Sequence, residues 1–232
     1  MKKIGVIIFA IALIIGLVFS NVFTFGKAKE RLFNWSFFSG VSGSGNTVTE
    51  KRDVEGFTAV DVSGVFKVEI TAQRDFAVEI EADDNLLPFI TTKVEGGVLK
   101  IKTEKRITSH DPIRLRISAP NIEKIESSGA SNVTITDLKN SEFSIDSSGA
   151  SKISVEGETS SLTIDVSGAS KINAGDLKAV DVNIEASGAC HVDVNVSGEL
   201  KTDASGASRI VYSGTPTNIR KKASGASRVS PK

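Results

Sequence analysis

The tripeptide Ser-Gly-Ala recurs through the C-terminal half of the chain at intervals of 18 to 20 residues. Around each copy, apolar and polar residues alternate, as in Phe143-Ser144-Ile145-Asp146, and a period of two is typical of β-strands. A unit of this length holds only two or three short strands, which cannot bury an apolar face alone, so successive units must stack. The repeat therefore predicts an all-β, single-domain β-solenoid with coils of 18 to 20 residues. Its glycines are Gly129, Gly149, Gly168, Gly188, Gly206 and Gly225, and Ser63-Gly64-Val65 is a related earlier copy.

Residues counted from each glycine fall into columns of shared character. The positions four before and four after the glycine are mostly aliphatic and predict core ladders, because equivalent positions of stacked coils lie over one another. A glycine between two inward-facing runs predicts a corner, since it has no Cβ to obstruct a bend. The ladders weaken only at Thr202 and Lys221, as expected of terminal coils that meet water. The ladder residues are Val60, Ile125, Ile145, Ile164 and Ile184 before the glycine, and Val68, Val133, Ile153, Ile172, Val192, Ile210 and Val229 after it.

Two further columns carry charge. Like charges on neighbouring rungs, about 4.8 Å apart, repel by roughly 0.9 kcal/mol per pair in water, and an adjacent row of opposite charge would offset this repulsion. The columns are interpreted either as a solvated, self-neutralised face or as a surface that binds a polyanion, a glycan or divalent cations. The acidic column, three residues before the glycine, contains Asp61, Glu126, Asp146, Asp165, Glu185 and Asp203, and Lys222 breaks it. The basic column, three residues after the glycine, contains Lys67, Asn132, Lys152, Lys171, His191, Arg209 and Arg228. The candidate binding residues are Asp146, Asp165, Glu185 and Asp203 with Lys152, Lys171, His191, Arg209 and Arg228.

Residues 50–126 alternate in the same way but lack the tight repeat. A short helix with an acidic N-terminal end is predicted at residues 83–88, and Glu95-Gly96-Gly97 predicts a hairpin turn. This half is expected to form the opening coils of the same solenoid, with longer excursions, and to cap one end of its core. Strands are expected at 57–62, 66–70, 77–82, 98–102 and 113–117.

An uncharged apolar run follows the basic start Met1-Lys2-Lys3. It extends over 22 residues, from Ile4 to Phe25. A membrane span needs about 20 residues, and the apolar part of a signal peptide is usually about 7–15. Residues 1–28 are therefore expected to form a hydrophobic helix that is either an uncleaved membrane anchor or a cleaved signal peptide. Both alternatives predict export: the domain is membrane-anchored and faces outward, or it is periplasmic, at the cell surface or secreted.

Residues 29–49 are rich in aromatic residues, glycine and serine and are expected to form a linker, with the solenoid domain at residues 50–232. Trp35, Phe37 and Phe38 are expected either to sit at the membrane interface or to cover the first coil.

The composition excludes several kinds of site. Lys plus Arg and Asp plus Glu each number 28, so the broad basic field that nucleic-acid binding requires is missing. One cysteine and two histidines are too few for a closed zinc site, and no metal or other cofactor is expected. Neighbouring strand residues point to opposite faces, so Cys190 is expected to be a buried ladder residue and His191 a surface one, not a catalytic pair. The serines that directly precede the glycines are expected to form a hydroxyl ladder that needs only ordinary hydrogen bonds.

Three features that occur in order resemble one family. They are Gly56-Phe57-Thr58-Ala59-Val60-Asp61-Val62-Ser63-Gly64, then Pro120-Asn121-Ile122-Glu123-Lys124-Ile125, and then the iterated Ser-Gly-Ala-Ser. Together they resemble the putative auto-transporter adhesin head GIN-domain family of bacterial envelope proteins over about residues 50–230. The resemblance implies a secreted or surface-exposed right-handed parallel β-helix, an adhesin-like role and no established catalytic residues.

The favoured functional hypothesis is a non-catalytic module of the cell envelope or surface. Its repeated ladder face is expected to bind a glycan, a cell-wall polymer or a partner protein through many weak contacts. The regularity of the columns argues against a catalytic centre. Two alternatives stay open: a polysaccharide-active β-helix enzyme that uses paired carboxylates of the acidic column, and a membrane-tethered envelope sensor or regulator. Contact with a membrane is expected through residues 1–28 if that segment is uncleaved.

Overall fold

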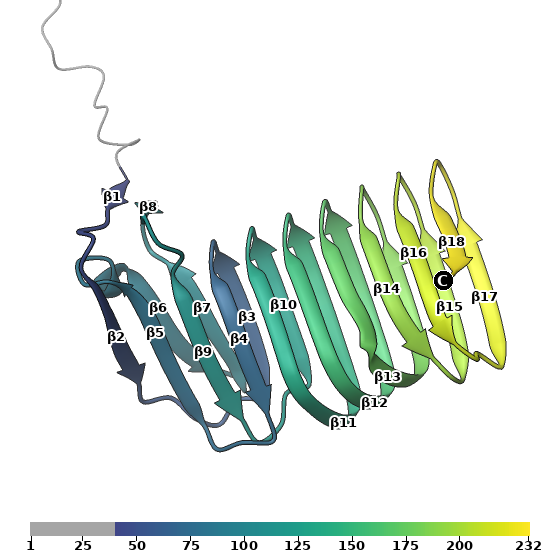
Figure 1. Cartoon of the computed structure of the whole chain (residues 1–232), viewed down its shortest axis with the longest axis horizontal. Coiled ribbons are helices and arrows are strands. Elements are labelled where there is room, and N and C mark those ends of the chain that lie inside the picture. Colours follow the sequence, from purple (N-terminus) through teal and green to yellow (C-terminus); the bar gives the residue numbers. More distant parts are fainter. Residues whose placement is uncertain (1–39) are drawn as a thin grey trace, which may run out of the picture. The chain divides into compact units, whose positions relative to one another are not determined.

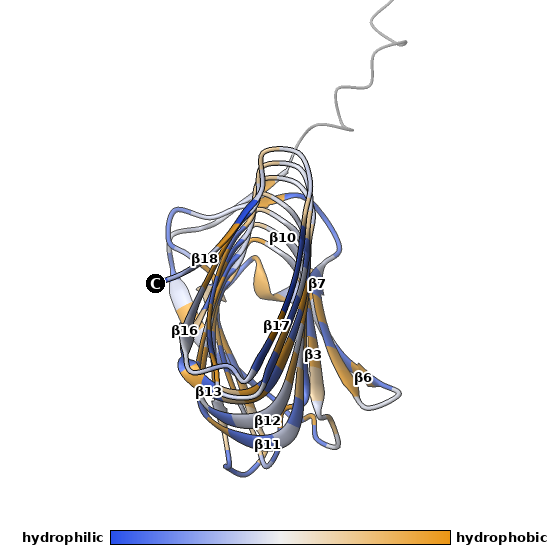
Figure 2. Ribbon diagram, turned by 90° about the vertical axis from the view of Figure 1, so that its right-hand side faces the viewer, coloured by the Kyte–Doolittle hydropathy of each residue, from blue (hydrophilic) through white to orange (hydrophobic). Residues whose placement is uncertain are grey.

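The computed structural model describes residues 40–232, whose regular structure consists almost entirely of strands. Hydrogen bonds join 16 of these strands into one sheet that folds back on itself in about five solenoid turns (Figures 1 and 2). The predicted all-β solenoid is confirmed, whereas its right-handed winding stays a prediction. The strands are β1 (Val41–Ser42), β2 (Thr47–Arg52), β3 (Ala59–Gly64), β4 (Lys67–Ala72), β5 (Ala77–Asp83), β6 (Ile90–Glu95), β7 (Val98–Thr103), β8 (Ile107–Thr108), β9 (Arg114–Ala119), β10 (Lys124–Gly129), β11 (Asn132–Gly149), β12 (Lys152–Gly168), β13 (Lys171–Ala186), β14 (His191–Val196), β15 (Glu199–Ala204), β16 (Arg209–Gly214), β17 (Asn218–Ala223) and β18 (Arg228–Pro231).

Each coil passes along two walls that enclose the core. A strand begins just after one Ser-Gly-Ala corner, the chain bends at the far end, and a second stretch returns to the next corner. In β11, β12 and β13 both stretches belong to one long strand, whose register shifts at the bend. The stretches stack in parallel on their counterparts in the next coil. We call the wall before the glycines the pre-glycine wall (β7, β3, β10, the second halves of β11 to β13, β15 and β17). The post-glycine wall contains β9, β4, the first halves of β11 to β13, β14, β16 and β18.

Both predicted core ladders face the space between the walls. The residues four before the glycine, from Val60 to Ile184, and those four after it, from Val68 to Ile210, are completely buried. Equivalent residues are direct neighbours in the parallel register, as Ile145 is of Ile164 and Ile164 of Ile184. Burial of an aliphatic side chain stabilises by about 1.5–3 kcal/mol, so these two ladders supply much of the driving force for folding.

The Ser-Gly-Ala corners are confirmed as bends, and they are stacked backbone against backbone. A Cβ on Gly188 would lie 2.4 Å from the carbonyl oxygen of Gly168, and the φ of Gly188 is +100°. The amide of Ala189 donates to the same carbonyl oxygen at 2.8 Å. Glycine is therefore required here for close approach as well as for conformation.

The residue two positions after each Ser-Gly-Ala glycine is serine, or Cys190 after Gly188, and these side chains form an inward ladder that is buried except at Ser227. Ser151 and Ser170 are 2% exposed, and each donates to the glycine carbonyl of the preceding coil, at 3.4 and 3.2 Å. The serines directly before the glycines also stack in register, as Ser128, Ser148 and Ser167 do, but this predicted ladder lies on the outer face. Its hydroxyl groups make no side-chain hydrogen bond within the described chain, so the hydrogen-bonded ladder is the inward one.

The N-terminal coils do not stack in sequence order. β3 lies between β7 and β10, and β4 lies between β9 and β11, so the later β7–β9 coil sits outside the earlier β3–β4 coil. Antiparallel β2, β5 and β6 then close this end of the core. The predicted strands and the hairpin turn at Gly96-Gly97 are confirmed, and this half does cap the core.

The helix predicted at residues 83–88 is wrong. Only one 3₁₀ turn forms there, at Leu87–Phe89, and it has no side-chain N-cap. The two acidic residues expected to begin a helix bind other segments. Asp83 is buried and accepts a hydrogen bond from the Ser109 hydroxyl at 3.0 Å, and Asp84 accepts one from the Asn46 side chain at 2.9 Å.

The end of the predicted linker is structured. Val41 and Gly43 donate to the carbonyl oxygens of Arg106 and Thr108 at 2.9 and 2.8 Å, which pairs β1 with β8, and β2 begins at Thr47. Residues 29–39 of that linker and the predicted anchor or signal peptide at residues 1–28, with its hydrophobic helix, lie outside the described residues. Within residues 40–232, no helix has the length and apolar character that a membrane crossing requires.

At the C-terminal end, an exposed lysine takes a ladder position. Lys221 occupies the place of the aliphatic ladder in the last coil, and its Nζ donates to the Tyr212 hydroxyl at 3.1 Å and lies 4.6 Å from the ring centroid. A charge at a ladder position of a terminal strand opposes pairing with another chain. The weakened ladder predicted for this end is confirmed.

Candidate functional site

The two charged columns lie on opposite walls. The acidic column faces outward from the pre-glycine wall, with Asp146, Asp165 and Glu185 in direct register, and the basic column faces outward from the post-glycine wall. No ion pair within residues 40–232 joins one column to the other. The predicted self-neutralised face is therefore wrong, because the chain reverses direction at the corner between the two columns.

The basic column is longer than the sequence predicted. Arg114 of β9 is the parallel partner of Lys67, so the column runs from Arg114 across Lys67 to Arg228 on eight consecutive rungs. Only Asn132 in this series lacks a basic side chain. The order of the eight residues is Arg114, Lys67, Asn132, Lys152, Lys171, His191, Arg209 and Arg228.

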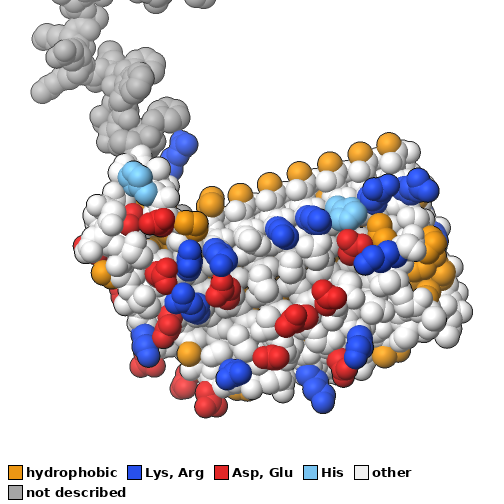
Figure 3. Space-filling view, viewed as in Figure 1, with side chains coloured by type: hydrophobic (Ala, Val, Ile, Leu, Met, Phe, Trp, Pro, Cys, Tyr) orange, Lys and Arg blue, Asp and Glu red, His pale blue; other side chains and the backbone are white. Residues whose placement is uncertain are grey.

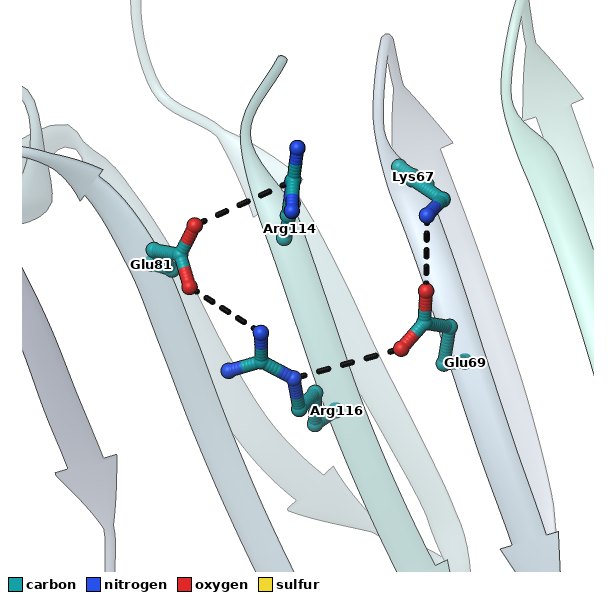
Figure 4. Close-up of polar contacts among 5 residues, drawn as sticks. All are labelled: Lys67, Glu69, Glu81, Arg114 and Arg116. Carbon is teal, nitrogen blue, oxygen red and sulfur yellow. Dashed lines mark hydrogen bonds and ion pairs between the residues drawn. The ribbon is translucent and has the colours of Figure 1, made fainter. Parts of the chain in front are cut away.

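The first two members of the basic column are neutralised by carboxylates. Figure 4 shows the network, in which Lys67 Nζ lies 2.8 Å from Glu69 Oε1 and Arg114 Nε lies 3.8 Å from Glu81 Oε1. Arg116 Nη2 contacts Glu81 Oε2 at 3.1 Å, and its Nε lies 3.9 Å from Glu69 Oε2. The hydrogen bond from Lys67 is the main cause that lowers the pKa of Glu69; burial opposes it, and the charges of Lys67, Arg116 and Arg114 lower the pKa further. These groups link β5, β9 and β4 and leave little free charge at this end.

The remaining cations of the basic column are exposed and unpaired. Lys152, Lys171, Arg209 and Arg228 have no carboxylate partner within the described part of the chain, and His191 contacts Asp193 at 3.1 Å. Lys152 and Lys171 lie on neighbouring strands about 4.8 Å apart, as do Arg209 and Arg228, and His191 occupies the single rung between the two pairs. Four unpaired cations in one row create a local positive potential on a chain whose net charge is zero.

A row of small apolar side chains borders the basic column. The residue directly after each glycine is alanine, or Val65 in the first copy, and all seven are exposed at the ridge of the corner. Figure 3 shows this row of hydrophobic side chains along one edge, with basic side chains beneath it. The ridge and the column form a straight strip that can make both apolar and charged contacts. The ridge residues are Val65, Ala130, Ala150, Ala169, Ala189, Ala207 and Ala226.

The acidic column has cations only near its ends. Glu126 is paired with Lys124, Asp203 is 2.7 Å from Lys222 Nζ, and Lys100 is the register partner of Asp61. Asp146, Asp165 and Glu185 in the middle are exposed and have no ion pair within residues 40–232. The middle of the pre-glycine wall therefore repels an anion that the post-glycine wall attracts.

Burial raises the pKa of Asp61 above its ordinary value of 3.8, and the neighbouring Glu126 raises it further, while Lys100 and Lys124 oppose the change. The folded protein then binds this proton more tightly than the unfolded chain does. The free energy of unfolding accordingly falls as the pH rises through the interval between the ordinary and the raised pKa, and the loss is complete above it.

We expect Asp61→Asn to raise the midpoint of thermal unfolding at pH 7 by about 1–2 °C, because it removes this partly buried charge. The gain should shrink near pH 3, where Asp61 is protonated in both states. Circular dichroism melts of the parent, of Asp61→Asn and of the exposed-loop control Asp53→Asn at both pH values measure this. A lower midpoint, or a gain independent of pH, contradicts the assignment.

The pair Cys190 and His191 is confirmed as two unrelated side chains. Cys190 is 2% exposed in the buried ladder, with its thiol 3.3 Å from the Ser187 carbonyl oxygen, while His191 faces outward. In the described chain, no group of three or more His, Cys, Asp and Glu side chains is placed to hold a metal ion.

Three solved structures of proteins described as putative adhesins have the same fold. The one from Bacteroides fragilis is 21% identical, with a TM-score of 0.67, and the match covers 83% of this chain and 100% of that one. The one from Parabacteroides merdae is 18% identical, with a TM-score of 0.54 and coverage of 83% and 99%. The one from Parabacteroides distasonis is 18% identical, with a TM-score of 0.53 and coverage of 84% and 100%. Likeness at these identities shows the fold alone.

No curated protein matches the sequence. A family model does, and it spans residues 56–216, from the turn before β3 to the loop after β16. That span contains the β3–β4 coil, the excursion and five of the six Ser-Gly-Ala corners. The features that suggested the resemblance thus lie within the matched region, and the chain belongs to the family described as "Putative auto-transporter adhesin, head GIN domain".

Proposed function

We propose that this protein is a non-enzymatic adhesion module of the cell envelope that binds an extended anionic polysaccharide along its basic column. The observation that carries the proposal is the row of four unpaired, exposed cations on the post-glycine wall, two on each side of the His191 rung. A folded protein gains nothing from like charges at strand spacing, since each neighbouring pair costs roughly 0.9 kcal/mol in water. A linear polyanion laid along the row removes that cost at every rung.

The strip suits a polymer better than a small ligand. Each exposed charge contact contributes only about 0.2–1 kcal/mol, so useful affinity requires several contacts made together. The alanine ridge beside the column offers methyl groups to the apolar edges of sugar rings, and the rigid parallel stack keeps the contacts in register. Family membership supports an adhesin-like role at the cell surface or envelope. Residues 1–28 would supply export, by a cleaved signal or by an anchor that leaves the domain facing outward.

The proposal is tested with polygalacturonate as the anionic polymer and dextran as the neutral one. We expect the parent to bind polygalacturonate, more weakly at high salt because ions screen exposed charges, and not to bind dextran along this strip. The triple variant Lys152→Ala, Lys171→Ala, Arg209→Ala should bind about tenfold more weakly or worse, as measured by biolayer interferometry.

A matched control removes the same charges from the opposite wall. The variant Lys201→Ala, Arg220→Ala, Lys222→Ala also loses two lysines and one arginine, all exposed on β15 and β17. It should retain the parent affinity. Equal losses in both triple variants would show a net-charge effect, and absence of binding by the parent would reject the anionic-polymer proposal.

A further inference from the structure

The pre-glycine wall carries a second feature, a hollow where the repeat is interrupted. Its volume is about 370 Å³, within the range of small-molecule sites, and it lies where hairpin β6–β7 joins β3 and β10. Figure 2 shows β6 splayed away from β3, and residues of both strands line the hollow. The hollow is separated from the basic column because the two lie on opposite walls.

Ammonium, carboxylate and hydroxyl groups line the hollow. Lys100 and Lys102 of β7 stand directly beside Asp61 and Ser63 of β3 in the parallel register, and Ser128 of β10 follows Ser63. The floor therefore alternates ammonium, carboxylate and hydroxyl groups. From the other side, Thr91, Lys93 and Glu104 line the wall of the hollow.

The charges of the hollow balance. Three lysines, Lys93, Lys100 and Lys102, face three carboxylates, Asp61, Glu95 and Glu104. Of these six groups, only Lys100 and Glu95 form an ion pair, with Nζ and Oε2 2.9 Å apart. Within residues 40–232, no side-chain partner occupies Lys93, Lys102 or Glu104. Asp61 is half-buried, and no hydrogen bond to its carboxylate is formed by the described residues, although its burial is enough to raise its pKa. The acceptor positions of this carboxylate are therefore open to hydrogen-bond donors of a ligand.

We propose that this hollow binds a neutral sugar residue of a glycan, with Asp61 accepting hydrogen bonds from sugar hydroxyls and Lys102 donating to sugar oxygens. A sugar presents donors and acceptors on every edge, which matches a mixed lining and not a lining of one sign. Zero net charge in the hollow gives no attraction for an anionic polymer, and the acidic column beyond Asp61 repels one. Ser63 and Ser128 can donate or accept and fit either orientation of a hydroxyl.

Asp61→Asn separates binding from folding. The same substitution that is expected to raise thermal stability should weaken sugar binding, because the amide lacks the negative charge of the carboxylate and replaces one of its two acceptor oxygens by an NH2 donor. A folded variant that is more stable and binds less well cannot be explained by structural damage.

The experiment is saturation-transfer NMR and chemical-shift titration with chitotriose, maltotriose and cellotriose as neutral probes and trigalacturonate as the acidic probe. We expect at least one neutral trisaccharide to bind the parent at millimolar concentration or below. Asp61→Asn and Lys102→Ala should each weaken that binding about tenfold. Asp165→Asn, a carboxylate of the same column outside the hollow, should not change it.

Three results would overturn the assignment: no neutral probe binds the parent, only trigalacturonate binds, or Asp165→Asn weakens binding as much as Asp61→Asn does. The basic-column variant Lys152→Ala, Lys171→Ala, Arg209→Ala should leave trisaccharide binding intact. The experiments can therefore reject either binding proposal without rejecting the other.

Discussion

Replacing Gly168 by alanine is expected to destabilise the solenoid by about 2–5 kcal/mol and to lower the thermal midpoint by roughly 5–15 °C. The new Cβ would lie 2.4 Å from the carbonyl oxygen of Gly149, and the φ of Gly168 is +84°, so steric overlap and backbone strain add together. The obstructing atom belongs to the backbone and cannot rotate away. Relief requires separating two coils, which weakens the hydrogen bond of 2.8 Å from Ala169 to that oxygen.

Substitutions at two other glycines distinguish the cost of steric overlap from the cost of backbone strain. Gly96 has φ +60° but no atom within 4 Å of its Cβ position, so Gly96→Ala should cost only the conformational part, about 1–2 kcal/mol. Gly175 has neither a positive φ nor a close neighbour, and Gly175→Ala should be neutral or slightly stabilising. Urea denaturation followed by circular dichroism gives all three values. If Gly168→Ala costs no more than Gly96→Ala, coil contact is not the reason for glycine at the corners.

The regular part of the fold could be predicted because the repeat marks equivalent residues. Once each glycine is aligned, the aliphatic columns at four residues on either side identify the core, and period two identifies the outward charges. The N-terminal stacking order could not be predicted in this way. Alternation in β9, as in Arg114-Leu115-Arg116, shows which face is buried but not which strand is the neighbour. Arg114 was therefore missed as a member of the basic column.

The separation of the two charged columns follows from the alternation of the sequence. Residues two and four after the glycine share a face under period two, so Ser151 must point inward if Ile153 does. The same alternation places Lys152 outward on the post-glycine wall and Asp146 outward on the pre-glycine wall. An acidic and a basic column separated by a reversal of the chain belong to different surfaces, and each can then bind a different ligand.

The hollow at Asp61 had no comparable signal. Its residues come from β6, β7, β3 and β10, and Lys93 and Lys102 look like ordinary outward lysines in their own strands. Only the insertion of β3 between β7 and β10 brings them to one place. A repeat pattern predicts which residues are neighbours only where the coils stack in sequence order, so it could not predict a site formed where that order changes.

Loss of the Ser170 hydroxyl is the second large effect expected, about 2–4 kcal/mol for Ser170→Ala. This oxygen accepts from the Ser147 hydroxyl at 3.0 Å and from the Ser151 amide at 3.3 Å, and it donates to the Gly149 carbonyl oxygen at 3.2 Å. Ser147 is 1% exposed, so both donors would be left buried without a partner. The Gly149 oxygen keeps its bond from Ala169.

The equivalent Cys190 shows which replacements the ladder accepts. Its thiol lies 3.6 Å from the Gly168 carbonyl oxygen in the place that Ser170 occupies one coil earlier, so Ser170→Cys should cost less than half as much as Ser170→Ala. Ser148→Ala, which removes an exposed hydroxyl beside the same corner, should stay within about 0.5 kcal/mol of the parent in urea denaturation. Equal effects of Ser170→Ala and Ser148→Ala would contradict the hydroxyl ladder as a stabilising element. The expected order instead assigns the two serines of Ser-Gly-Ala-Ser different tasks, because the first faces solvent on the pre-glycine wall and the second ties each coil to the one before it.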